Sequence, residues 1–175
     1  MSNFINQSKN LFELQQLEKA IKAELDLDCH ILEYSVDTPI DTLVVNIEID
    51  GMGRSRIVSI MFIPLDASDV ETLKLLQFYC ETPICVESSS NRAIIAELLA
   101  AINLKIPIGA FCLNDQHAVT FKYVNALGKF KTINSEEFLE TLLLWMFSLD
   151  SMSSLIESVA QGKQSLELAV KLLNE

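Results

Sequence analysis

Glycine and proline are scarce in this sequence, with five glycines and four prolines among 175 residues. Both residue types dominate turns and disordered linkers, so their scarcity argues against long unstructured stretches and fits one domain over residues 1–175. Basic residues are also few, at 13 against 24 acidic residues. The net charge of −11 opposes binding to nucleic acid and to anionic membrane surfaces, because both carry phosphates.

The sequence also lacks an export signal and a long hydrophobic run. Residues 1–16 show no basic start followed by an apolar stretch, which a signal peptide would have. The most apolar segment, residues 142–147, is far shorter than the about 20 residues of a membrane helix. We therefore expect a cytoplasmic protein whose four cysteines stay reduced.

Hydrophobic residues are abundant, since they make up 50% of the chain and the mean hydropathy is +0.29. This is more apolar material than the core of a monomer of this size needs. The excess favours an apolar surface that a partner covers.

Hydrophobic periodicity predicts both helices and strands. Spacings of three and four predict helices over residues 9–25, 90–104, 135–160 and 165–173. Alternation predicts strands over residues 31–36, 43–50, 54–63, 110–113 and 118–124. Residues 73–86 fit either type, and their aromatic and β-branched residues favour a strand. The hairpins predict an α+β fold with a mainly antiparallel sheet and helices packed on one side of it.

Polar residues mark several predicted element ends. Candidate N-caps, whose side chains can accept from otherwise unpaired amides, are Ser8, residues 88–90, Asn134 and Ser165. Residues 50–53 supply a hairpin turn, and Gly162 ends the long helix.

Pro107 and Gly109 predict a sharp corner between a helix and the following strand. Proline fixes its own φ, so the turn falls on Gly109, the nearby residue without a Cβ. We expect a positive φ at Gly109, or a neighbour packed too closely for a methyl group.

Two histidines and several cysteines are the candidates for a metal site or a catalytic site. His30 follows acidic residues, and the spacing from Cys80 to Cys85 is C-x4-C, followed later by Cys112 and His117. Structural zinc sites use shorter spacings such as C-x2-C. The three cysteines lie in apolar, strand-like segments, where cysteine behaves as a small hydrophobic residue. We therefore predict buried structural thiols, exposed histidines, and neither a metal, a cofactor nor a catalytic residue.

The predicted helix over residues 135–160 has apolar side chains on every side, although packing on a sheet needs only one apolar stripe. Other helices of the same chain can cover the remaining sides. We favour the second explanation, that another subunit covers part of the helix, because aromatic residues and methionine are enriched in interfaces. This assigns Leu142, Trp145, Met146 and Leu149 to a dimer or partner interface.

Residues 91–173 resemble the YbjN-like family of small bacterial proteins. The similar features are the helix ending at Asn103, residues 106–111, the strand at residues 119–123 and the long final helices. The resemblance implies the fold shared with type III secretion chaperones, which has a curved antiparallel sheet and usually forms homodimers. It also implies peptide or protein binding, without recognised catalytic residues.

These observations lead to one functional hypothesis and one alternative. We expect a non-enzymatic protein-binding module, chaperone-like or regulatory, that acts as a homodimer and also binds a second protein. The alternative is a small-molecule or metal-binding enzyme that uses His30, His117 and the cysteines.

Overall fold

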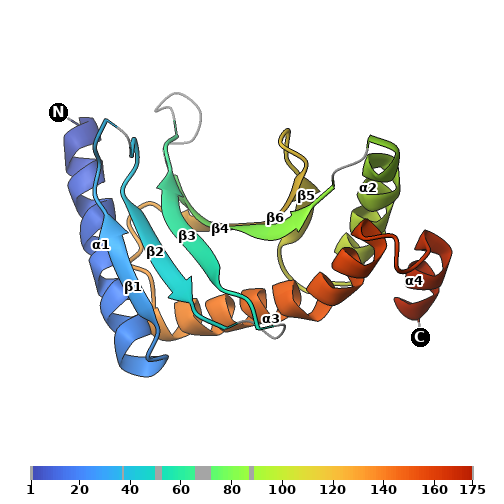
Figure 1. The fold of residues 1–175 in the computed structure, drawn as a ribbon. Coiled ribbons are helices and arrows are strands. Elements are labelled where there is room, and N and C mark those ends of the chain that lie inside the picture. Colours follow the sequence, from blue (N-terminus) through green and yellow to red (C-terminus); the bar gives the residue numbers. More distant parts are fainter. Residues whose placement is uncertain (1, 37, 50–52, 66–71, 87–88, 175) are drawn as a thin grey trace.

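The computed structural model describes residues 2–36, 38–49, 53–65, 72–86 and 89–174, and these form helices around a single sheet (Figure 1). The helices are α1 (Ser2–Glu24), α2 (Ser89–Asn103), α3 (Ser135–Ala160) and α4 (Leu166–Leu172). The strands are β1 (Asp28–Leu32), β2 (Thr42–Ile47), β3 (Arg56–Ile63), β4 (Leu73–Cys85), β5 (Ala110–Leu113) and β6 (Ala118–Gly128). The predicted turn at residues 50–53 and the cap at residues 88–90 lie partly outside the described residues.

The six strands form one antiparallel sheet in the order β1-β2-β3-β4-β6-β5. This confirms the predicted α+β class, and Figure 1 shows that the sheet is curved. Residues 73–86 are a strand, as predicted, because β4 buries every second side chain from Lys74 to Ile84. That period of two matches a strand at the centre of a sheet and not a helix.

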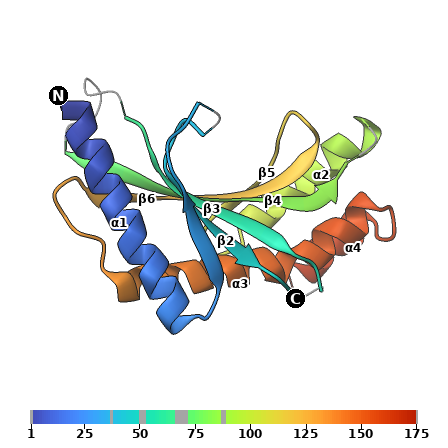
Figure 2. The same cartoon turned by 60° about the vertical axis from the view of Figure 1, so that its left-hand side comes forward.

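All four helices lie on one side of the sheet. α3 runs beneath the strands, with α1 at one end and α2 and α4 at the other (Figures 1 and 2). The core between helices and sheet includes Trp145, whose ring lies 5.2 Å from that of Phe121 and 5.9 Å from that of Phe78. The other face of the sheet, which we call the open face, has no described helix over it.

Ion pairs join the helices to the sheet on the covered side. Glu13 of α1 pairs with Lys74 of β4, and both side chains are buried. The Lys74 Nζ also lies 5.4 Å from the centre of the Phe62 ring, a cation–π distance. Arg54, just before β3, pairs with Glu157 of α3 at 3.0 Å, and Arg56 at the start of β3 pairs with Asp150 of the same helix.

Two predicted boundaries near the N-terminus are wrong. α1 begins at Ser2, so Ser8 lies inside the helix and is not its N-cap. β1 spans Asp28–Leu32 and not residues 31–36, because Cys29 and Ile31 pair with β2 and turn towards the core. Two residues after the strand ends, the Tyr34 amide donates to the Asp41 carboxylate at 2.8 Å.

Candidate protein-interaction surface

The long helix α3 is capped at both ends as the sequence predicts. The Asn134 side chain accepts from the amides of Glu136 and Glu137, so it is the N-cap. Gly162 follows the C-cap with a φ of +68°, a conformation that ends helices and favours glycine. Ser165 caps α4 in turn, by accepting from the Leu168 amide.

The inner side of α3 corrects part of the predicted interface. Leu142, Trp145 and Leu149 have no exposed surface, because they pack against the sheet within one chain. They cannot contact a partner in this fold, and only Met146 of the predicted set is partly exposed. The first explanation, coverage by the same chain, is therefore the correct one for this side of the helix.

The outer side of α3 carries a separate set of apolar residues. Leu143, Leu144 and Phe147 are 48%, 43% and 66% exposed. They stand at spacings of three and four, so they adjoin on the helix surface. We call these three residues the α3 ridge. Sequence periodicity missed it because both sides of the helix are apolar, and the buried side is recognised only once the sheet is in place.

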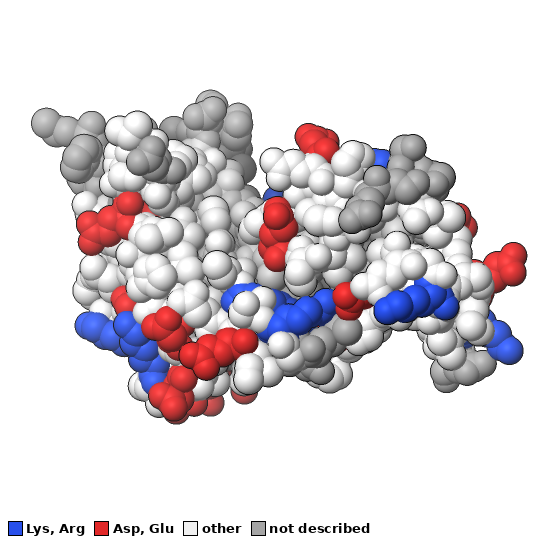
Figure 3. All heavy atoms as spheres, viewed as in Figure 1, with Lys and Arg blue, Asp and Glu red and all other residues white. Residues whose placement is uncertain are grey.

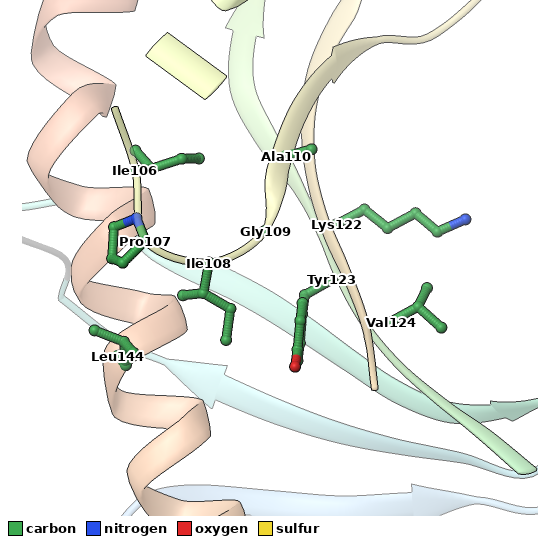
Figure 4. Close-up of a pocket in the computed structure, with 9 residues that line it drawn as sticks. All are labelled: Ile106, Pro107, Ile108, Gly109, Ala110, Lys122, Tyr123, Val124 and Leu144. Atoms are coloured by element: carbon green, nitrogen blue, oxygen red, sulfur yellow. The ribbon is translucent and has the colours of Figure 1, made fainter. Parts of the chain in front are cut away.

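An open groove lies beside the ridge and has a volume of about 540 Å³. Its walls are the connector between α2 and β5 and the edge of β6, and Leu144 of α3 also lines it (Figure 4). The lining residues are Ile106, Pro107, Ile108, Gly109, Ala110, Lys122, Tyr123, Val124 and Leu144. In Figure 4 the Tyr123 ring lies alongside the Ile108 side chain. The groove is mainly apolar, and Lys122 is its charged lining residue.

The corner at Gly109 has the predicted positive φ, at +81°. A Cβ at this position would lie 2.5 Å from Cζ of Phe121, which is fully buried. The positive φ and the close neighbour, which the sequence predicted as alternatives, are therefore both present at Gly109. The Asn103 side chain further fixes the connector, since it accepts from the Phe111 amide at 2.8 Å and donates to the Phe111 carbonyl at 3.0 Å.

Charged side chains are unevenly distributed over the molecule. On the side seen in Figure 3, most of the lysine and arginine residues and several acidic residues lie along the lower part, and a few acidic residues are scattered over the mostly uncharged surface above them. Because the chain as a whole carries a charge of −11, a surface with few acidic groups is the exception. Such uncharged areas are where apolar partners bind with the smallest desolvation penalty.

The two histidines lie far apart. His30 is on β1 at one edge of the sheet, whereas His117 is in the turn between β5 and β6 at the other edge. His117 has a φ of +64°, and its Nδ1 accepts from Arg92 at 2.8 Å. Both are exposed, as predicted. Within the described ranges, no three residues among His, Cys, Asp and Glu are grouped as metal ligands.

The cysteines divide into two pairs, which corrects the prediction that all are buried. Cys29 and Cys80 are buried, whereas Cys85 and Cys112 are exposed. The physical reason is strand alternation: the first pair points to the covered side of the sheet and the second pair to the open face. Burial raises the pKa of the Cys29 thiol, which makes it less reactive.

α3 is the described helix whose length and composition would allow it to cross a membrane, with a mean hydropathy of 1.2 over its most apolar window. Core helices of globular proteins meet the same criteria. Here Leu142, Trp145 and Leu149 lie in the protein core, and the buried Ser148 and Ser153 hydroxyls donate to the backbone of the same helix.

The arrangement defines an α+β protein with a six-stranded antiparallel sheet and helices on one side. No family model matches the sequence, and no curated protein does. Among solved structures, a crystal structure of YbjN from E. coli, a proposed transcription regulator, is similar with a TM-score of 0.46 and 13% identity, over 86% of this chain and 93% of that one. The likeness concerns the path of the chain and transfers no role to any residue.

Proposed function

We propose that this chain is a non-enzymatic, cytoplasmic protein-binding module, chaperone-like or regulatory, that acts as a homodimer. The observation that supports the proposal is the α3 ridge beside the groove. Leu143, Leu144 and Phe147 expose apolar surface that the chain itself does not cover. Contiguous apolar surface of this kind is characteristic of protein interfaces, where aromatic side chains contribute most of the binding energy.

The enzymatic alternative finds less support in the geometry. It needs His30, His117 and the cysteines to converge, and the sheet holds the two histidines at opposite edges. Cys29 and Cys80 are buried on the covered side, whereas both histidines are exposed. Cys85 does lie near His117, because the neighbouring Val86 amide donates to the His117 carbonyl at 2.9 Å. Within the described residues, however, no three of His, Cys, Asp and Glu are grouped as metal ligands.

The homodimer is tested by sedimentation equilibrium at micromolar concentrations. The wild-type protein should sediment at twice the chain mass of 19.6 kDa. Phe147→Asp should give the single-chain mass, because an uncompensated charge in an apolar interface opposes association. Phe12→Asp is the matched control, since Phe12 is 59% exposed but lies on α1, and it should remain dimeric.

Circular dichroism should show the same helix content for all three proteins, so that loss of the dimer is not confused with unfolding. A wild-type protein that stays monomeric over the whole concentration range would refute the homodimer. A Phe147→Asp protein that stays dimeric would instead place the interface away from the α3 ridge.

A further inference from the structure

The edge of β6 has a stretch without a strand neighbour. β5 pairs with β6 only from Val119 to Lys122, whereas β4 pairs with β6 as far as Gly128. Within the described chain, residues 123–128 of β6 therefore have a strand on one side only. The groove lies against the start of this stretch, at Tyr123 and Val124. Every second residue of such an edge directs its N–H and C=O outwards, where they need hydrogen-bond partners.

The other edge of the sheet is built differently. β1 is five residues long and includes Asp28 and His30. Proteins commonly protect edge strands by short length, charge or proline, because a bare edge invites pairing with another chain. The open stretch of β6 lacks two of these devices, since no charged residue and no proline lies between Lys122 and Lys129.

The groove beside this edge is already shaped in the free protein. Asn103 bonds to both backbone groups of Phe111, and Gly109 packs against the buried Phe121 ring. Pro107 adds its own fixed φ. The connector that forms the far wall therefore loses little conformational entropy on binding, which favours affinity.

We infer that the groove and the open stretch of β6 bind one extended segment of a partner protein, which adds a strand to the sheet. The inference rests on the proposed function, because it specifies how a protein partner is held. The groove is bounded by the connector and by the β6 edge, and its charged lining residue, Lys122, calls for a carboxylate on the occupant. Pairing with a second copy of this protein is the competing outcome that the experiment below distinguishes.

The lining residues define the chemistry of the bound segment. Side chains of an added strand alternate between the two faces of the sheet. On the helix side they meet Ile108, Tyr123 and Leu144, so apolar residues fit there. On the open face they meet Lys122, which is exposed and is the charged residue of the lining. The segment should therefore alternate apolar residues with polar ones and place a carboxylate opposite Lys122.

A synthetic eight-residue peptide tests this inference. Its sequence alternates valine with threonine, and one central threonine is replaced by glutamate. Amide chemical-shift changes in the protein should concentrate at residues 123–127, and the outward-pointing amides among them, which belong to every second residue, should exchange more slowly with solvent. A peptide of the same sequence with N-methylated backbone amides should not bind, because it cannot form the strand hydrogen bonds.

Charge exchange tests the role of Lys122. Lys122→Glu should weaken binding of the glutamate peptide by about fivefold, as expected for an exposed charge pair. A peptide with lysine in place of the glutamate should recover the loss. Lys19→Glu makes the same change in net charge on the exposed surface of α1 and should leave the affinity unchanged.

Three results would overturn the inference: equal binding of the N-methylated peptide, shift changes located away from residues 123–127, or slow exchange of these amides that increases with protein concentration without peptide. The last result would identify a second copy as the occupant. A monomeric protein that binds the peptide at β6 would keep the inference and refute only the homodimer. A dimeric protein that does not bind the peptide at β6 would refute the inference and keep the homodimer.

Discussion

The two faces of the sheet are made by the same strands but have different properties. The covered face carries the fully buried Val58, Phe78 and Phe121. The open face carries the neighbours of these residues in the sequence, such as the exposed Ile57 and the half-buried Tyr79. Packing on the covered face stabilises the fold, whereas side chains on the open face and along the β6 edge are available for contacts. Substitutions on the covered face should therefore lower stability strongly, whereas substitutions on the open face should change it little.

The largest expected difference is between Trp145→Ala and Ile57→Ala. Trp145 is fully buried on the covered side, so its truncation should lower the free energy of unfolding by about 3–5 kcal/mol. Ile57 is 60% exposed, and its truncation should change that free energy by less than about 0.5 kcal/mol. Urea denaturation measures both values. If Trp145→Ala prevents folding, Trp145→Phe should still fold and show an intermediate loss of the free energy of unfolding. Equal losses for substitutions at Trp145 and at Ile57 would contradict the comparison.

A second large difference concerns lysines on the two faces. Lys74→Met leaves the Glu13 carboxylate buried without its cation, which should cost about 3 kcal/mol of stability. Lys122→Met on the open face should cost almost nothing, since Lys122 is exposed. Combining Lys74→Met with Glu13→Leu should recover most of the loss, because no buried charge remains. Thermal melting of the four proteins tests this, and a double variant as unstable as Lys74→Met would be evidence against the pairing.

Gly109→Ala should have an intermediate effect, about 2 kcal/mol of destabilisation. A methyl group there meets the buried Phe121 ring, and the φ of +81° is itself unfavourable for alanine. Gly53→Ala is the matched control, because Gly53 has a φ of +76° but no atom within 4 Å of its would-be Cβ. The difference between the two melting temperatures isolates the steric contribution. An unchanged or raised melting temperature for Gly109→Ala would show that the corner is not constrained.

The smallest effect on stability, with a clear chemical readout, is expected at the cysteines. Cys85 and Cys112 on the open face should react rapidly with a thiol reagent in the native protein, whereas Cys29 and Cys80 should react only on unfolding. The raised pKa of Cys29 slows its reaction further at neutral pH, since less thiolate is present. Cys112→Ala should alter stability by less than about 0.5 kcal/mol. Mass spectrometry of labelled peptides identifies the sites, and rapid labelling of Cys80 would contradict its burial.

The wrong burial assignments in α3, β4 and β5 share one physical cause. Periodicity identifies which residues of an element lie on the same side, but it does not say which side meets the core when both are apolar. In α3, periodicity therefore assigned Leu142, Trp145 and Leu149 to a partner interface, although they are buried in the core. In β4 and β5 it placed Cys85 and Cys112 in the core because their neighbours are apolar. Both assignments depend on the position of the rest of the sheet.

The sequence by itself determined most helices and strands, the antiparallel hairpins, the caps at Asn134 and Ser165, and the constrained corner at Gly109. These features depend on side-chain spacing, local hydrogen bonds and backbone sterics, which act within a few residues. Only the tertiary structure decided that α3 turns Trp145 inwards and Phe147 outwards, that Glu13 and Lys74 meet 61 residues apart, and that β5 leaves part of β6 uncovered. These features depend on contacts between elements distant in the sequence, whose geometry is set when the sheet and the helices pack together.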